Sequence, residues 1–290
     1  MLFFFVPRVR CELWDFQEED SEMRESNLQR MVDAARHDPV VAGMIRESVL
    51  QAFLSLGWNE GEAKFFIESF LLDGDIEDLR KYEQSLRHTM PLPGMENLAS
   101  GMEARANLAY SKIRSHIRGS SVLDLGGGSG EIGACIARDG YVVCIADVRD
   151  WRRDDGLRFV QVRDNVIDLP DMSWETVVVL HVYHHSNDPE ALLADSFRVA
   201  SRRVIIIESV TDDMTEFLYM CWWDWFHNRV MHYSENPADK TPVPCRFLST
   251  VVWEQTVWRL LGLSPVVSQR LECDQVLSPV HHRLYVFDKK

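Results

Sequence analysis

The sequence predicts an α/β protein built on a mostly parallel sheet of seven strands that is flanked by helices. Short apolar runs, typical of buried parallel strands, alternate with helical patterns through the second half of the chain. The first of these runs, 121–125, leads into a glycine-rich turn and then a helix. This order places free backbone N–H groups at the carboxyl end of a strand, so the turn predicts a nucleotide-sized binding site.

Length and charge limit the classes of partner. With 290 residues the chain can bury a sizeable core, and its formal net charge is −14. A nucleic-acid substrate requires a basic groove, and the sequence contains no Lys/Arg cluster. We therefore expect no nucleic-acid partner, and a small-molecule or carrier-bound substrate instead. The sequence does not indicate whether the protein is a monomer or an oligomer.

The cysteines and the N-terminal segment indicate a cytoplasmic protein. The six cysteines are scattered without a C-x-x-C pair, which favours reduced thiols in the core. The apolar run at residues 2–6 is too short to span a membrane and lacks the features of a signal peptide. We therefore expect no membrane partner.

The N-terminal third is predicted to be helical. An acidic stretch predicts a mobile segment over residues 1–25, and helical patterns fill residues 26–94. The first helix is expected to begin at Ser26, where Ser-Asn-Leu-Gln resembles a capping box, and further helices to begin after Asp38 and Asn59. These helices are either a structural cap on the sheet edge or a lid over the substrate.

A proline-rich break separates this cap from the catalytic domain. A fourth helix is predicted over residues 75–86, and Pro91–Gly94 then interrupts the pattern, so the domain is expected to occupy residues 95–290. A helix over 102–117 leads into the first strand. Further strands are expected at 141–146, 159–162, 176–180, 203–207, 266–271 and 282–287, helices at 131–138, 190–200 and 250–261, and an aromatic insertion at about 211–248.

The glycine turn carries the most specific signal. Asp124 lies two residues before the first glycine, and the turn contains Gly126, Gly127, Gly128 and Gly130. A carboxylate so placed would repel a pyrophosphate and attract the ammonium group of an amino acid. The Asp-x-Gly-x-Gly-x-Gly pattern resembles motif I of class I S-adenosylmethionine (SAM) methyltransferases, which implies a Rossmann-like fold with SAM as cofactor.

The same resemblance implies further cofactor contacts. Asp147 follows the second predicted strand, where an acid accepts hydrogen bonds from the ribose hydroxyls. Either Asp164 or Asn165 matches the position that binds the adenine amino group, and the choice between them stays open. Tyr110 and Arg105, in the helix before the first strand, are the candidates to lie over the methionine portion.

A histidine-rich loop after the fourth predicted strand supplies the catalytic candidates, and it resembles the post-strand loop of the same family. His181, His184 and His227 are unranked candidate bases, with Tyr183 as an orienting hydroxyl. His184 and His185 are adjacent and are expected to point apart. For this reason we expect no metal site.

The aromatic insertion is expected to pack on the N-terminal helices. Most of its rings should be core residues, but Trp222 and Phe226 are candidates to line the sulfonium, because a cation binds well against aromatic faces. Phe65, Phe66 and Phe70 are expected to supply the facing surface. Together the two segments would form a lid over the cofactor.

The resemblance implies methyl transfer to a small-molecule or carrier-bound acceptor, with secondary metabolism as one setting. Two alternatives share the same residues. One is intramolecular cyclisation of SAM, as in azetidine-2-carboxylate synthases of this fold, which releases methylthioadenosine and needs no acceptor. The other is a SAM-binding protein without catalysis.

Overall fold

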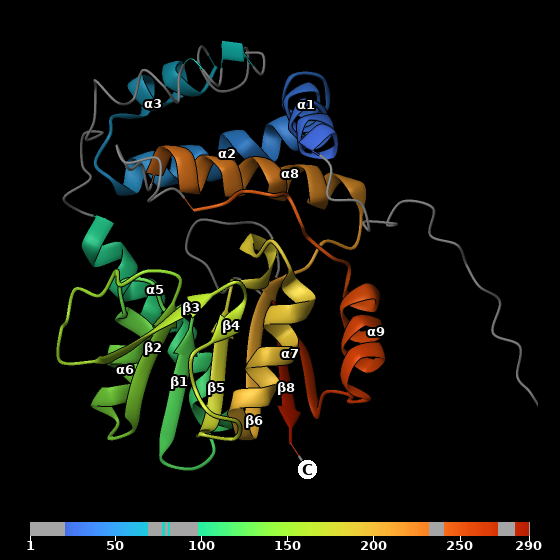
Figure 1. Ribbon diagram of the computed structural model, residues 1–290. Helices are drawn as coiled ribbons and strands as arrows, with labels where there is room; N and C mark the ends of the chain where they lie inside the picture. Colours follow the sequence, from blue (N-terminus) through green and yellow to red (C-terminus); the bar gives the residue numbers. More distant parts are fainter. Residues whose placement is uncertain are drawn as a thin grey trace, which may run out of the picture.

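A computed structural model describes residues 21–68, 77–78, 81, 98–231, 241–271 and 282–289. Phe70, the break at Pro91–Gly94 and most of the helix predicted at 75–86 lie outside these residues. The described elements form a sheet with helices on both faces and a helical layer along one edge (Figure 1).

The sheet contains eight strands among the described residues. They are β1 (Ser121–Leu125), β2 (Val142–Asp147), β3 (Arg158–Arg163), β4 (Val166–Ile167), β5 (Trp174–Leu180), β6 (Ala200–Ser209), β7 (Val267–Leu271) and β8 (His282–Asp288). Their spatial order is β4-β3-β2-β1-β5-β6-β8-β7. Five neighbouring strands are mutually parallel, namely β3, β2, β1, β5 and β6. The chain changes direction across the sheet between β1 and β5, the place where ligands bind in open α/β folds.

The seven expected strands are present, and β4 is the additional one. It is only two residues long, pairs antiparallel with β3, and follows a turn in which Asp164 and Asn165 both have positive φ. Both backbone conformations favour Asn and Asp, as in a tight hairpin. A strand this short has no periodicity from which it could be predicted.

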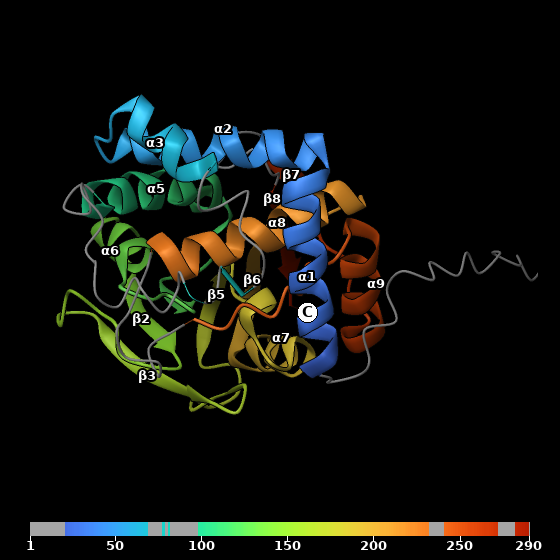
Figure 2. The ribbon, with the colours of Figure 1, turned by 90° about the horizontal axis from the view of Figure 1, so that it is seen from above.

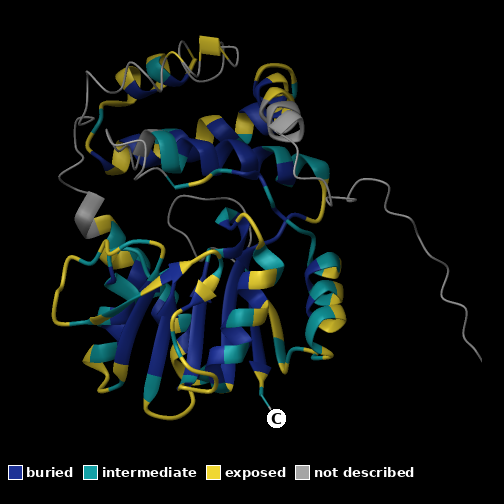
Figure 3. Cartoon of the chain, in the orientation of Figure 1, coloured by how far each residue is buried: buried dark blue, intermediate teal, exposed yellow. Residues whose placement is uncertain are grey.

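Two pairs of helices cover the sheet. On one face lie α5 (Leu98–Ile113), which continues into the short helix η3 (Arg114–His116), and α6 (Glu131–Arg138). On the other lie α7 (Pro189–Val199) and α9 (Thr250–Leu261), the latter capped by Ser249 as expected. Side chains alternate between the faces, so Val122 packs under α5 and α6 while Leu123 packs on the opposite side. The central strands β1, β5 and β6 are therefore buried on both faces (Figure 3).

The helical layer consists of α1 (Ser21–His37), α2 (Pro39–Ser55), α3 (Glu60–Phe66) and α8 (Met214–Phe226). It lies along the edge of the sheet from which α8 emerges after β6, the carboxyl edge of the parallel strands (Figures 1 and 2). Asp38 and Asn59 cap α2 and α3 as predicted. The predicted start at Ser26 is wrong, because α1 begins at Ser21 and includes Glu22 and Glu25 of the acidic stretch.

One hydrophobic cluster joins α8 to α1, α2 and α3. Trp222 and Phe226 are fully buried in it, stacked with ring centroids 5.3 Å apart, and Phe53 of α2 meets Phe226 edge-on at 5.9 Å. Phe66 packs partly against the cluster, whereas Phe65 is 67% exposed and does not contribute the surface expected of it. Within the described parts of the chain, every helix is too short or too polar to cross a bilayer.

Candidate functional site

The turn between β1 and α6 requires glycine at two close contacts. Gly126 has a φ of 70°, and a Cβ there would come within 2.3 Å of the Val182 side chain. A Cβ on Gly127 would lie 2.8 Å from Oδ2 of Asp124. The turn thus packs directly on the histidine-rich loop on one side and on the Asp124 carboxylate on the other.

Asp124 is a buried carboxylate with an unmet hydrogen-bonding requirement. Its side chain is 1% exposed, and Oδ2 has no hydrogen-bond partner among the described residues. Burial, reinforced by the charge of Asp147, raises the pKa of Asp124 to about 7. A carboxylate placed in this way is stabilised by a cationic partner.

A cavity of about 140 Å³ lies beside Asp124, between the glycine turn, α5 and the ends of β5 and β6. Its lining includes Arg105, Gly127, His181 and Ile207. The four elements that meet here are distant in the sequence, and the switch in strand order between β1 and β5 brings them together.

Asp147 lies at the end of β2, against the same turn. Its Oδ2 accepts a hydrogen bond from the Gly128 N–H at 2.9 Å, and its Oδ1 accepts one from the Val148 N–H at 2.7 Å. Burial raises the pKa of Asp147, and these backbone hydrogen bonds oppose the rise. The carboxylate is thereby held at the outer rim of the glycine turn.

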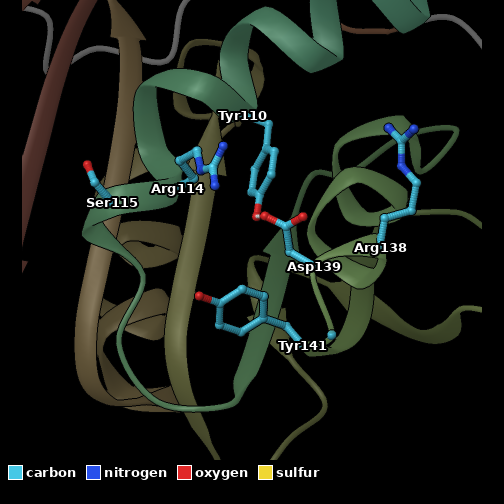
Figure 4. A pocket seen from close by; sticks show the side chains of 7 residues that line it. Tyr110, Arg114, Ser115, Arg138, Asp139 and Tyr141 are labelled. Carbon is cyan, nitrogen blue, oxygen red and sulfur yellow. Dashed lines mark hydrogen bonds between the residues drawn. The ribbon is translucent and has the colours of Figure 1, made fainter.

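Arg105 and Tyr110 occupy different surroundings. Arg105 lines the cavity, whereas the Tyr110 hydroxyl donates a hydrogen bond to Asp139 at 2.6 Å (Figure 4). Asp139 follows the last residue of α6, so Tyr110 lies in a separate surface pocket at the end of that helix remote from the glycine turn. The two positions lie about 140° apart around the axis of α5, so Tyr110 is on a different face from Arg105, Ala109 and Lys112, which line the cavity.

Asp164 and Asn165 form the turn between β3 and β4, and neither lines the cavity. The Asn165 Oδ1 accepts a hydrogen bond from the Ser186 hydroxyl at 2.7 Å, which ties this turn to the histidine-rich loop, while Asp164 is exposed. The side chain of Asn165 therefore connects two loops of the protein through its hydrogen bond with Ser186.

His181 and Tyr183 point in different directions. His181 lines the cavity and meets His282 edge-on with ring centroids 4.3 Å apart, and burial, followed by the proximity of His282, lowers its pKa well below the usual 6.5. The Tyr183 hydroxyl instead hydrogen-bonds to Ser196 of α7 at 2.9 Å in the core. Tyr183 therefore does not present its hydroxyl to the cavity. The orienting role expected of it from the sequence has no support in this contact.

His184 and His185 converge. They belong to a 3-10 turn, η4 (Tyr183–His185), and their ring centroids are 4.0 Å apart. Their Nε2 atoms lie 3.9 and 3.8 Å, respectively, from Oδ1 of Asp224 on α8. The prediction that the rings point apart is wrong, because a tight helical turn does not alternate side chains as an extended strand does.

Two acidic residues of this cluster were not singled out from the sequence. Glu208, 1% exposed, contacts Nδ1 of His184 and accepts the Tyr183 N–H at 3.0 Å. The signal for Glu208 is a single acid that follows the apolar run of β6. Asp224 has no comparable signal, since its partners are distant in the sequence. His227 lies beyond the cluster, at the start of η5 (His227–Met231), and stacks on Trp223.

A methyltransferase domain family model matches residues 99–238. Among solved structures, 1,6-didemethyltoxoflavin-N1-methyltransferase of Burkholderia thailandensis is 16% identical, with 73% of this chain and 90% of that chain covered and a TM-score of 0.46. Magnesium protoporphyrin IX methyltransferase of Synechocystis PCC 6803 is 12% identical, with 80% and 100% covered and a TM-score of 0.45.

No curated protein sequence matches the chain. Both solved structures are distant in sequence and share the fold only in part. Residues 99–238 of this chain match the methyltransferase domain family, and the described strands have the Rossmann-like order expected from the glycine turn.

Proposed function

We propose that this protein binds SAM at the glycine turn and transfers its methyl group to a small-molecule acceptor. The observation that carries the proposal is Asp124, a buried carboxylate whose Oδ2 has no partner among the described residues and which lines the cavity at the turn. The α-ammonium group of SAM is a cation suited to this position, and the pyrophosphate of a dinucleotide is not.

The other residues of the turn fit the remainder of the cofactor. The backbone at Gly127 allows close approach because no side chain intervenes, and Asp147 at the rim is placed to accept hydrogen bonds from ribose hydroxyls. Bound SAM supplies an electrophilic methyl group on a sulfonium. The protein's contribution is to hold the two reactants in line and to exclude water.

His181 is the residue best placed to accept a proton from the acceptor. It is the one among the candidate bases His181, His184 and His227 that lines the described cavity, and its lowered pKa keeps the ring neutral at physiological pH. A neutral imidazole can take the proton that the acceptor loses as its lone pair forms the new bond to the methyl carbon and the carbon–sulfur bond breaks.

The nature of the acceptor is supported by charge and by shape. The net charge of −14 disfavours a nucleic-acid substrate, and the layer formed by α1, α2, α3 and α8 lies over the carboxyl edge of the sheet (Figure 1). The family match favours methyl transfer over cyclisation of SAM. Trp222 and Phe226 pack within the helical layer, so they do not support an aromatic cage for the sulfonium.

The test is calorimetric binding of S-adenosylhomocysteine to the wild-type chain and to Asp147→Ala. We expect the substitution to weaken binding by about 1.5–3 kcal/mol, the cost of losing hydrogen bonds to a charged group in a partly buried site. Glu47→Ala, which removes an exposed carboxylate on α2, is the matched control and should bind as the wild type does. Unchanged affinity in Asp147→Ala, or NADH binding as tightly as S-adenosylhomocysteine, would contradict the proposal.

A further inference from the structure

We infer that His184, His185 and Asp224 form a binding site for a divalent transition-metal ion, with zinc the ion that suits it best. The site is separate from the proposed cofactor cavity, and the inference does not depend on SAM binding. One ligand atom from each of the three residues lies within 4.8 Å of the others.

The hydrogen bond of His185 leaves a nitrogen lone pair at the centre of this group. His185 Nδ1 donates to the Pro242 carbonyl oxygen at 2.7 Å, and because a carbonyl can only accept, that nitrogen carries the hydrogen. In the neutral ring Nε2 therefore presents a lone pair toward Asp224. His184 repeats the arrangement, with Nδ1 against the Glu208 carboxylate and Nε2 toward Asp224.

The distances do not match hydrogen bonds. The separations of 3.9 and 3.8 Å between the two Nε2 atoms and Asp224 Oδ1 exceed the roughly 3.2 Å limit of an N–H···O bond. Two ligands of a tetrahedral zinc ion lie about 3.3–3.4 Å apart, given metal–ligand distances of about 2.0–2.1 Å. The two separations from Asp224 therefore need to shorten by about half an ångström, and the two histidine atoms, which lie within 4.8 Å of each other, need to close by rotation of the side chains.

Burial supports a cation at this position. The side chains of His184 and Asp224 are each 6% exposed, and Oδ2 of Asp224 has no hydrogen-bond partner among the described residues. Oδ1 accepts a hydrogen bond from Asn228 at 2.8 Å, which fixes the orientation of the carboxylate. A bound cation would supply the buried Asp224 carboxylate with a charged partner, and it would replace a proton on Nε2 of His184.

The outer contacts are those of metal-bound histidines. Such a ring usually donates its second N–H to a carboxylate or a backbone carbonyl, and here Glu208 and Pro242 supply one of each. Two imidazoles and one carboxylate suit zinc with an open fourth position, whereas magnesium prefers oxygen ligands alone. The side chain of His185 is 21% exposed, which gives the open position a route to solvent.

The experiment is a zinc titration of the tag-free full chain, after dialysis against a chelator, in competition with a chromogenic zinc indicator. We expect one zinc per chain and no competition from magnesium. His185→Gln and Asp224→Asn should each weaken zinc binding at least about 100-fold, and Glu208→Gln about 10–100-fold, as for an outer contact. His37→Gln, an exposed histidine at the end of α1, should bind zinc as the wild type does.

Less than one zinc per chain in the wild type, or equal affinity in His185→Gln and His37→Gln, would overturn the site. Cobalt bound to the wild type gives a second readout that needs no variant. A thiolate-to-cobalt absorption band would assign the metal to the buried Cys221 and Cys245 instead, and would also overturn it. Calorimetry with S-adenosylhomocysteine is independent of all these outcomes, so failure of the metal site and failure of the proposed function are distinguishable.

Discussion

At the scale of single residues, the protein places one carboxylate where it is unfavourable until a ligand arrives. Asp124 follows Leu123 in β1 and lies beneath Gly127, so its position is set by the backbone of the sheet and of the turn. Its environment raises its pKa from 3.8 to about 7. A group whose pKa is raised by folding destabilises the folded state where it is ionised.

This predicts a pH-dependent effect of Asp124→Asn on the ligand-free protein. Below the unfolded pKa of 3.8 the carboxyl is mostly protonated in both the folded and the unfolded chain, and the penalty is small. It grows as the pH rises toward 7 and is complete above it, where 3.2 pKa units, from 3.8 to about 7, correspond to at most about 4 kcal/mol. The variant should therefore gain stability over the wild type between pH 5 and pH 8.

Urea unfolding of both proteins at the two pH values measures this gain. The same substitution should weaken S-adenosylhomocysteine binding at pH 8, because the ammonium loses its carboxylate partner. A stability difference that does not change with pH would show that Asp124 is not buried as a carboxyl with a raised pKa.

At the scale of elements, α8 connects the methyltransferase domain to the N-terminal helices. It begins at Met214, is capped by the side chain of Asp213, and shares a cluster of aromatic side chains with α1, α2 and α3. One turn of the same helix carries Asp224 toward His184 and His185. Disturbing the packing of α8 should therefore affect both stability and the geometry of the histidine cluster.

Phe226→Ala tests this packing. Phe226 is fully buried and contacts Trp222 and Phe53, so truncation should lower the free energy of unfolding by about 3–5 kcal/mol. Phe65→Ala, at a 67% exposed position on α3, is the matched control and should cost less than about 0.5 kcal/mol. Chemical denaturation compares the two, and equal small losses would contradict a joint core between α8 and the N-terminal helices.

The same scale shows what the sequence could predict. The central strands were predictable because parallel strands buried on both faces have continuous apolar runs, as in 176–180 and 203–207. The helix starts at Asp38 and Asn59 were predictable because a capping side chain is a local signal. Ser26 carries the same kind of signal but lies inside a longer helix, so the helix start predicted from it was wrong.

The histidine cluster was not predictable for a different reason. Its geometry depends on a 3-10 turn at 183–185 and on a helix that crosses it forty residues later, and neither relation leaves a periodic pattern. Asp124 and Asp147 could be found because their positions follow directly from strand ends. Residues that meet through tertiary packing, such as Glu208 with His184, require the structure.

At the scale of the whole molecule, the protein combines three features: the glycine turn proposed to bind SAM, the neutral His181 beside it, and the helical layer over the carboxyl edge of the sheet. The layer consists largely of segments outside residues 99–238, the part shared with the methyltransferase domain family. Acceptor specificity is expected to reside in such additions, because the strands and the glycine turn are occupied with holding the cofactor.

The most direct test is to identify the product formed from SAM. The protein is incubated with SAM and a set of small-molecule thiols, phenols and amines, and the products are identified by mass spectrometry. We predict S-adenosylhomocysteine together with an equal amount of a methylated acceptor, both lost in Asp124→Asn. Methylthioadenosine released without any acceptor, or no S-adenosylhomocysteine above the protein-free control, would contradict methyl transfer.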